Sequence, residues 1–350
     1  MSEEISLTPP QLTKLLLHTI KAKLPTLTLG GPGLGKTALH EQAANSLGYD
    51  YLAIYPATHD PTDLTGLAFP TVGTDGIKRL VRHIDDLLAT IFDAKKPLLV
   101  LLDEFGQAPP AMQSACAPLL LARKIGKYKV PDHVVICAAS NRRQDRAGAA
   151  NILTQLISRF ATIVNLRPDA VSWLEKAMAD KISPEIISFI KTSPSRLFTF
   201  NADVNYADQR AYGCPRSWYA ASSLLRTDLP VDLWPAVFSG AVGVADSHLL
   251  IAHLTLIRSC VNVHDVVVER MSYSFPPVKS IGARWAFAVG VGAMANCDTI
   301  DRVIQVAQDI PSEYGIVALR QAAYSYPELD FSKVAESKLG KLILSSRGTS

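Results

Sequence analysis

A short glycine-rich segment carries the clearest chemical signal in the sequence. Residues 30–37 read Gly-Gly-Pro-Gly-Leu-Gly-Lys-Thr and match the pattern G-x-x-x-x-G-K-[ST]. Small residues let successive backbone N–H groups curl around a phosphate, and the positive end of a following helix dipole points at the same group. In such a loop Lys36 reaches the β- and γ-phosphates of a nucleotide, and the Thr37 hydroxyl holds Mg²⁺. We therefore expect nucleotide contacts from Gly30, Gly31, Pro32, Gly33, Leu34, Gly35, Lys36, Thr37 and Ala38.

Two adjacent carboxylates follow a strongly apolar stretch. Residues 98–102 contain no polar side chain, which predicts a strand covered on both faces, and Asp103 and Glu104 come directly after it. Asp103 would bind Mg²⁺ directly or through water, and Glu104 would orient and deprotonate an attacking water. Many apolar strands end in acidic residues, so this pattern gains its meaning from the phosphate-binding loop.

A third polar side chain, Asn141, follows another apolar segment at residues 135–140. An amide at the end of a neighbouring strand would help to hold a water against the γ-phosphate. The alternative is an ordinary asparagine turn.

The composition limits the class of protein. The chain has 350 residues, of which 48% are hydrophobic, enough for about two domains. The balance of 35 Lys+Arg against 32 Asp+Glu gives a net charge of +3, which by itself indicates neither nucleic-acid nor membrane binding. There is no signal-peptide pattern and no apolar run of about 18 residues, so we expect no membrane span. The five cysteines are far apart, and we expect buried free thiols in a cytoplasmic protein.

The elements that must position these residues alternate in type. Strands are expected at residues 24–29, 51–55, 98–102, 134–139 and 161–166, and a helix at 37–47, which predicts an α/β fold with a five-stranded, mostly parallel sheet. After Pro168 helices are expected at 171–179, 184–190 and 215–225, and mainly helix from 237 to about 344. We therefore predict a nucleotide-binding core at residues 1–167 and a helical lid with a helical C-terminal region at residues 168–345.

The phosphate-binding loop, the two carboxylates and the asparagine, in this order, resemble the motifs of AAA+ ATPases. Two further stretches are similar to the MoxR-like branch of that class. Residues 103–113 read Asp-Glu-Phe-Gly-Gln-Ala-Pro-Pro-Ala-Met-Gln, and residues 60–67 read Asp-Pro-Thr-Asp-Leu-Thr-Gly-Leu, which looks like the family's Asp-Pro-x-Asp-Leu-x-Gly segment. The resemblance covers about residues 12–225 and is looser to about residue 330.

The resemblance implies a P-loop AAA+ core with a helical lid, ATP and Mg²⁺ as cofactors, and hydrolysis of ATP to ADP and phosphate. It also implies a homo-oligomer, a hexameric ring, in which Arg159 reaches the γ-phosphate bound by the neighbouring subunit. Arg142 and Arg143 are rivals for that role, and an ordinary surface arginine is the alternative. Arg216, just after Pro215, is similar to a sensor arginine that couples the nucleotide state to the lid angle, unless it is only a helix-start residue.

One departure from the family is clear. MoxR-like chains usually carry Asn-Arg where this chain has Gly106-Gln107. The change leaves the nucleotide-binding motifs intact and bears on how hydrolysis is coupled to the neighbouring subunit.

The expected function is the chaperone-like remodelling or assembly of a partner protein, with a von Willebrand factor A-domain protein as the leading partner class implied by the resemblance. Residues 60–72 are where we expect contacts with a substrate or a pore, with Asp63 and Leu64 as the residues to replace. The alternatives are an ATP-dependent DNA-handling motor, a small-molecule kinase, and an ATP-dependent scaffold that hydrolyses slowly. No zinc finger or helix-turn-helix pattern supports a nucleic-acid partner.

Overall fold

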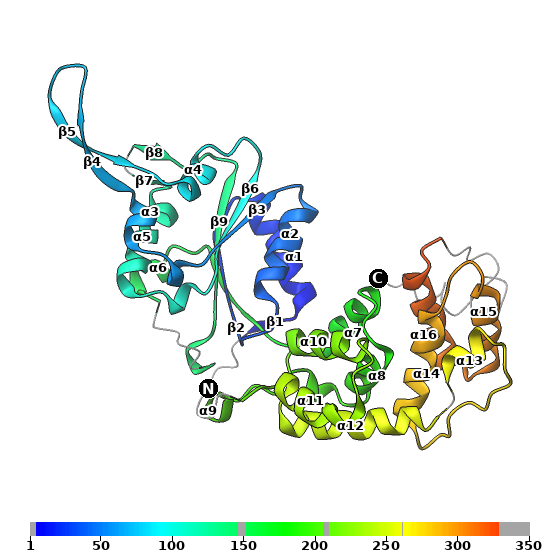
Figure 1. The fold of residues 1–350 in the computed structure, drawn as a ribbon. Coiled ribbons are helices and arrows are strands. Elements are labelled where there is room, and N and C mark those ends of the chain that lie inside the picture. Colours follow the sequence, from blue (N-terminus) through cyan, green and yellow to red (C-terminus); the bar gives the residue numbers. More distant parts are fainter. Residues whose placement is uncertain (1–4, 126, 146–151, 206–209, 261, 329–350) are drawn as a thin grey trace. The chain divides into compact units, whose positions relative to one another are not determined.

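The fold comes from a computed structural model that describes residues 5–125, 127–145, 152–205, 210–260 and 262–328 (Figure 1). The chain divides into two compact units. The nucleotide-binding unit, so named for the site described below, comprises Met1–Pro168 and Phe200–Gln209, and the helical unit comprises Asp169–Thr199 and Arg210–Ser350.

A six-stranded parallel sheet forms the centre of the nucleotide-binding unit. Its strands stand in the order β1 (Ser6–Leu7), β10 (Thr162–Leu166), β2 (Thr26–Gly30), β9 (Val134–Ser140), β6 (Leu98–Leu102) and β3 (Asp50–Ile54). The α/β fold with a parallel sheet is thus confirmed. The sheet has one strand more than expected, because the two residues of β1 pair with β10 at the edge.

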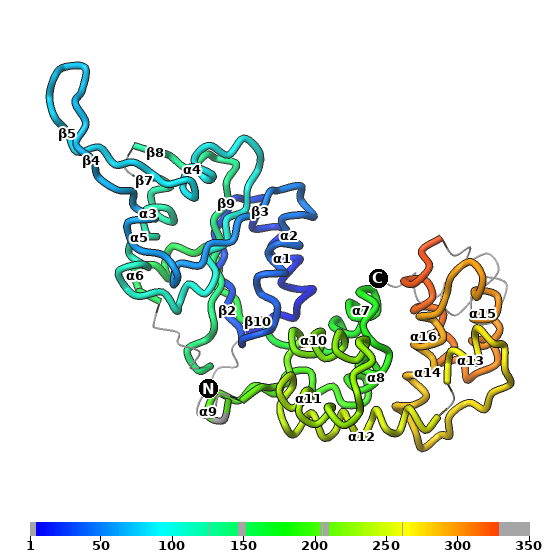
Figure 2. The backbone as a smooth tube through the Cα atoms, in the orientation of Figure 1, coloured from blue at the N-terminus to red at the C-terminus, as the bar shows by residue number. Residues whose placement is uncertain are grey.

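Helices cover both faces of this sheet. Figures 1 and 2 show α1 (Pro9–Lys21) and α2 (Lys36–Ser46) on one face, with α3 (Pro61–Thr65), α5 (Pro110–Leu121) and α6 (Thr154–Ile157) on the other. The remaining helices of the unit are α4 (Asp86–Phe92) and α9 (Ala202–Asn205). Covering both faces explains why β6 and β9 consist only of buried residues.

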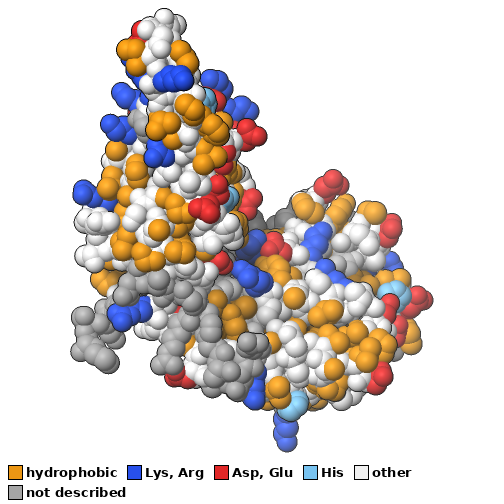
Figure 3. Space-filling view, turned by 60° about the vertical axis from the view of Figure 1, so that its left-hand side comes forward, with side chains coloured by type: hydrophobic (Ala, Val, Ile, Leu, Met, Phe, Trp, Pro, Cys, Tyr) orange, Lys and Arg blue, Asp and Glu red, His pale blue; other side chains and the backbone are white. Residues whose placement is uncertain are grey.

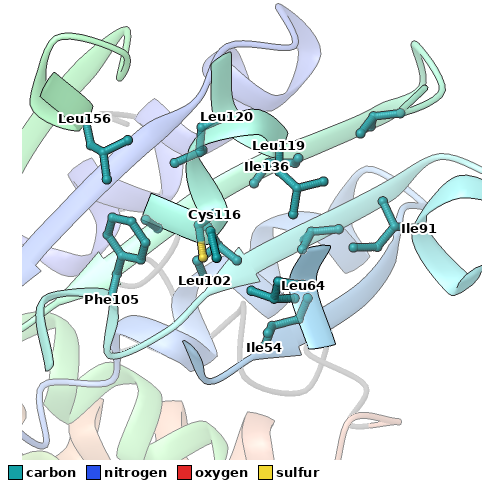
Figure 4. Packing of buried hydrophobic residues seen from close by; sticks show 14 of the residues in the cluster. Ile54, Leu64, Ile91, Leu102, Phe105, Cys116, Leu119, Leu120, Ile136 and Leu156 are labelled. Atoms are coloured by element: carbon teal, nitrogen blue, oxygen red, sulfur yellow. The ribbon is translucent and has the colours of Figure 1, made fainter. Parts of the chain in front are cut away.

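The hydrophobic core of the unit lies between the sheet and the α3–α5–α6 side. Figure 4 shows Leu102, the last residue of β6, and Phe105, three residues later, packed near Cys116 of α5, with Leu64 of α3 beside Ile54 of β3. All five of these side chains are fully or almost fully buried. Leu64 belongs to this core, so our expectation that it contacts a partner is wrong: its side chain has no exposed surface.

The nucleotide-binding unit also contains two antiparallel hairpins. The larger one joins β4 (Leu67–Val72) to β5 (Lys78–His83) and protrudes from the unit at the upper left of Figure 1. The smaller one pairs β7 (Lys124–Ile125) with β8 (Tyr128–Lys129), in the basic stretch that follows α5. Strand prediction from apolar runs misses the larger hairpin, because both of its faces are exposed.

The second unit contains only helices among its described elements, which confirms the expected helical extension. They are α7 (Ala170–Ala179), α8 (Pro184–Thr192), α10 (Pro215–Leu225), α11 (Trp234–Val242), α12 (Val244–Arg258), α13 (Val263–Val267), α14 (Ile281–Ala293), α15 (Ile300–Asp309) and α16 (Ser312–Ser325). Two buried clusters hold them together. One is built around Trp218 and Trp234, the other around Phe287 and Tyr314.

One stretch of the helical unit runs against our expectation that the chain has no membrane span. By length and composition, Val244–Val267 could cross a membrane. This is weak evidence, because the core helix of a water-soluble protein passes the same test. Asp246 of this stretch is buried, accepts a hydrogen bond from Thr199 Oγ1 (2.7 Å) and pairs with Arg196 (3.4 Å). These contacts tie the helix to its neighbours within the unit.

The cysteines differ in exposure. Cys116, Cys137 and Cys214 are buried, as expected, whereas Cys260 is partly exposed and Cys297 is exposed. All five are free thiols. Burial raises the pKa of the Cys116 thiol to about 12 and that of Cys137 to about 11.

Two leucines three positions apart provide a test of the core boundary. Replacing Leu64 by Ala removes a fully buried side chain, and we expect the free energy of unfolding to fall by about 2–5 kcal/mol. The same change at Leu67, whose side chain is exposed, should alter it by less than about 0.5 kcal/mol. Urea unfolding followed by circular dichroism measures both, and equal losses would contradict this placement of the core.

Candidate nucleotide-binding site

The candidate site lies where three parallel strands end together. In the register of the sheet, Leu102 of β6 pairs with Ala138 of β9, which in turn pairs with Leu27 of β2. The residues just beyond these strands, including Asp103 and Asn141, are therefore placed at one edge of the sheet. In open α/β sheets this carboxyl edge is where ligands bind.

The glycine-rich loop connects β2 to α2 at this edge. Gly33 and Gly35 have φ angles of 79° and 86°, a left-handed backbone that glycine adopts without a side-chain clash. Gly35 is the N-cap of α2, so the free N–H groups of the first turn of the helix follow the loop directly. The loop thus has the features that an anion-binding helix start requires.

Lys36 is held across the site from the loop to β9. Its ammonium group donates to the carbonyl oxygens of Gly30 (2.8 Å) and Gly31 (3.1 Å) and to Oδ1 of Asn141 (2.8 Å). The side chain is largely buried, so its charge is stabilised by these oxygens rather than by water. The structure brings together Lys36 and Asn141, which are 105 positions apart in the sequence.

Thr37 and Asp103 form the second link. Thr37 Oγ1 donates to Asp103 Oδ2 at 2.5 Å, which joins the first turn of α2 to the end of β6. Asp103 is buried and also accepts from the backbone N–H of Glu104 at 2.9 Å. A hydroxyl and a carboxylate oxygen side by side are the hard oxygen ligands that Mg²⁺ prefers. The two residues predicted to hold the metal therefore fit it.

The neighbouring carboxylate is in a different environment. Glu104 is exposed, and its side chain makes no hydrogen bond or ion pair to any residue that the structure describes. Its φ angle of 53° lies in the left-handed region, an uncommon conformation for a residue with a long side chain. Asp103 is thus fixed by hydrogen bonds, whereas the Glu104 carboxylate is available to a water molecule.

Ser140 is a site residue that our sequence reading missed. This buried serine ends β9; its hydroxyl accepts from the backbone N–H of Gly106 (3.1 Å) and donates to the carbonyl oxygen of Asn141 (3.0 Å). It connects the segment after Glu104 to Asn141. A hydroxyl at the end of an otherwise apolar segment was the available signal, but we assigned Ser140 no role of its own.

His40 of α2 packs next to the glycine-rich loop and is hydrogen-bonded on both sides of it. It is fully buried, and burial lowers its pKa, so the ring is neutral. Nδ1 donates to the carbonyl oxygen of Lys36 (2.9 Å), which leaves Nε2 to accept from Thr28 Oγ1 (3.4 Å). This side chain links α2 to β2 on either side of the glycine-rich loop.

The three arginines proposed for an action across a subunit interface differ in their contacts. Arg142 makes a bidentate ion pair with buried Asp145, with N–O distances of 3.0 and 2.8 Å. Arg143 and Arg159 are exposed, and neither side chain has a hydrogen-bond or ion-pair partner in the described part of the chain. Arg142 is therefore neutralised within its own subunit, whereas Arg143 and Arg159 are free to bind an external anion.

Arg216 lies in the helical unit. It occupies the first turn of α10, after Pro215, and its side chain is exposed. Its predicted role toward the nucleotide stays a prediction.

Comparison with known proteins agrees with this geometry. Residues 26–168 match the sequence profile described as "ATPase family associated with various cellular activities (AAA)". This segment is thus similar to AAA domains. It contains the glycine-rich loop, both carboxylates, Asn141 and Arg159, so the AAA+ P-loop fold expected for the core is confirmed.

The solved structures that resemble the chain do so at low identity. They include the RuvB Holliday junction branch migration motor of Thermotoga maritima, with 13% identity and a TM-score of 0.39, over 86% of this chain and 87% of that one. They also include NtrX from Brucella abortus, with 15% identity and a TM-score of 0.41, over 77% and 66%. Similarity at this level says nothing about shared function. No curated protein matches the chain in sequence.

Removal of the Ser140 hydroxyl tests the connection that it makes. Ser140→Ala leaves the N–H of Gly106 buried without a partner, so we expect the free energy of unfolding to fall by about 1–3 kcal/mol. Urea unfolding measures the loss. Ser46→Ala, at an exposed serine that bonds only to its own helix, is the control and should change it by less than about 0.5 kcal/mol. An unchanged free energy of unfolding in Ser140→Ala would show that this hydrogen bond does not stabilise the protein.

Proposed function

We propose that this protein is an Mg²⁺-dependent ATPase of MoxR-like type that forms a homo-oligomeric ring and remodels or assembles a partner protein. The observation that carries the proposal is the convergence of Lys36, Thr37, Asp103 and Asn141 at one edge of the sheet. Glu104 follows Asp103 directly, and its side chain has no partner in the part of the chain that the structure describes. The sequence similarity of residues 60–67 and 103–113 to the MoxR-like branch supports the finer assignment.

Each of these side chains has a role that follows from its contacts. Lys36 exchanges its carbonyl and amide partners for the β- and γ-phosphate oxygens of ATP, and the N–H groups of the loop and of the start of α2 bind the same phosphates. Thr37 and Asp103 hold Mg²⁺, which when bound neutralises phosphate charge. Glu104 removes a proton from the attacking water.

Asn141 is hydrogen-bonded to Lys36 and to Ser140. In the structure its amide oxygen accepts from Lys36, and its carbonyl oxygen accepts from Ser140. When Lys36 turns to phosphate, the amide is released and can orient the attacking water. The change of partner gives Asn141 a way to respond to the nucleotide.

A cation from the neighbouring subunit completes the site. Arg159 is exposed and without a partner in the described part of the chain, as a residue that must reach another subunit should be. Its charge would stabilise the negative charge that develops on the γ-phosphate, which makes hydrolysis depend on assembly. Arg216 would report the nucleotide state to the helical lid from within the same subunit.

The partner is a protein, with von Willebrand factor A-domain proteins as the leading class, and the expected location is the cytoplasm. The resemblance to the MoxR-like branch supports the partner class.

The first test of the ring is the solution mass of Glu104→Gln. This change removes the base but keeps the shape of the side chain, so the protein should bind ATP and retain it. We expect light scattering to give about six times the monomer mass with Mg-ATP and a smaller species without it. Lys36→Met, which removes the phosphate-binding charge, is the control and should stay small under both conditions. A Glu104→Gln monomer that binds ATP would contradict the ring.

Mixing two inactive variants tests the action of Arg159 across the interface. Arg159→Ala and Glu104→Gln should each lower hydrolysis by about 10³-fold. In a one-to-one mixture, half of the sites keep Glu104 and half of their neighbours supply Arg159, so about a quarter of the wild-type rate should return. Phosphate release measures the rate.

Arg143→Ala is the matched control, because Arg143 is equally exposed and unpartnered among the described residues. It should keep full activity. Loss of hydrolysis in Arg143→Ala alone, with recovery when it is mixed with Glu104→Gln, would assign the role to Arg143 instead.

A further inference from the structure

The β4–β5 hairpin, residues 67–83, displays apolar side chains on both of its faces. The side chains of Leu67, Phe69, Val72, Ile77 and Leu80 are each at least half exposed, and Leu80 is 75% exposed. Figure 3 shows hydrophobic and basic side chains next to each other on the protruding part of the molecule at the top of the view. Apolar side chains that are exposed together on a protein surface, with polar residues around them, are typical of an interaction site.

The hairpin is held firmly at its base. Arg82 donates to the carbonyl oxygens of Thr65 (3.2 Å) and Gly66 (2.9 Å), just before β4 begins. Gly66 has a φ angle of 76°, and a Cβ there would lie 2.6 Å from the carbonyl oxygen of His83, so only glycine fits this close approach to the end of β5. The base therefore fixes the direction in which the hairpin projects.

The tip is ordered by a second set of contacts. The guanidinium of Arg79 pairs with the carboxylate of Asp75, and Asp75 Oδ1 also accepts from the N–H of Ile77 at 3.1 Å. The pair holds the pKa of Asp75 below its usual range. A two-stranded hairpin by itself is only marginally stable in water. The contacts at its base and tip stabilise this one, so its exposed apolar residues are held on an ordered element.

The charges of the hairpin select the chemistry of its partner. Its one carboxylate, Asp75, is already paired with Arg79. Lys78 and Arg82 have no carboxylate partner among the residues that the structure describes. An occupant that carries acidic side chains would pair with them. Two copies of the hairpin in contact would bring like charges together, which disfavours a second copy of this chain.

The free edge of the hairpin selects the conformation of the partner. Its sheet has only two strands, so the outer edges of β4 and β5 are unpaired within the described residues. Pro70 removes one N–H group from β4, whereas β5 keeps all of its N–H groups. An extended segment can add as a third strand beside β5 and cover the apolar side chains.

We propose that the β4–β5 hairpin binds an extended segment of a partner protein that is rich in acidic and apolar residues, as a strand added beside β5. A nucleic acid is a poorer occupant, because aliphatic side chains such as Leu67 and Leu80 contribute nothing to phosphate binding. The one aromatic ring in β4 and β5 besides that of His83 is that of Phe69, and it already packs against the His83 ring, with 5.7 Å between the ring centroids. This inference rests on the proposed function and names the chemistry of the client segment.

A selection from random peptides tests the hairpin even though the client protein has not been identified. Random dodecapeptides displayed on phage are selected on the full-length protein, and those that also bind the Phe69→Ser/Leu80→Ser variant are removed. We expect the survivors to combine Asp or Glu with Leu, Ile, Val or Phe. Survivors that are basic, or no survivors, would overturn the proposal.

A selected peptide then allows a quantitative comparison. By fluorescence anisotropy its dissociation constant should rise at least tenfold with Phe69→Ser/Leu80→Ser or Lys78→Glu. Lys95→Glu, at an exposed lysine outside the hairpin, should leave it unchanged. An equal loss with Lys95→Glu would show that only net charge matters. Displacement of the peptide by a single-stranded oligodeoxynucleotide would favour nucleic acid instead.

Two controls separate this proposal from the catalytic one. The variants should keep the far-ultraviolet circular dichroism and the ATP binding of the wild type, which shows that only the hairpin has changed. The peptide measurement needs no hydrolysis and can be repeated with Glu104→Gln. If the protein hydrolyses ATP but does not bind the peptide, the hairpin proposal is wrong and the ATPase proposal stands. If it binds the peptide but does not hydrolyse ATP, the ATPase proposal is wrong and the peptide-binding role of the hairpin stands.

Discussion

The candidate site depends on one constraint, the position of β9 between β2 and β6. Each of these strands carries one part of the site just beyond its end: the glycine-rich loop after β2, Asp103 and Glu104 after β6, and Asn141 after β9. Because the strands are parallel and in register, these segments come together although they are far apart in the sequence. The apolar strands are thus as necessary to the chemistry as the polar residues that follow them.

Short hydrogen bonds then fix the parts relative to one another. Lys36 joins the loop to Asn141, Thr37 joins α2 to Asp103, and Ser140 joins Asn141 to the segment after Glu104. Most of these groups are buried, where an unmade hydrogen bond is costly. The site is therefore largely preorganised for phosphate and a divalent cation. Glu104, the one exposed member, does not share in this network through its side chain.

The sequence predicted the parts of the fold that follow from burial. Residues 98–102 predicted β6 correctly, because a strand covered on both faces must be apolar throughout. The β4–β5 hairpin has no such pattern, since neither face is covered, and it was missed. Leu64 was misread for the opposite reason: it lies in a motif expected to contact a partner, but tertiary packing buries it. Which leucine faces water depends on the fold and not on the motif.

The same limit applies to the site. Residue types and spacing were enough to find Lys36, Thr37, Asp103 and Asn141, because phosphate and metal chemistry restricts the choice of side chains. The preference for Arg159 over Arg142 and Arg143 rested on the family resemblance alone. The ion pair of Arg142 with Asp145 is visible only in three dimensions.

The distribution of cysteines has a practical consequence. Both thiols of the nucleotide-binding unit, Cys116 and Cys137, are buried and have raised pKa values, so they react only when that unit opens. The two accessible thiols, Cys260 and Cys297, both belong to the helical unit. A thiol reagent applied to the unaltered chain therefore labels the helical unit first, and later modification at Cys116 or Cys137 reports local opening around the nucleotide-binding core.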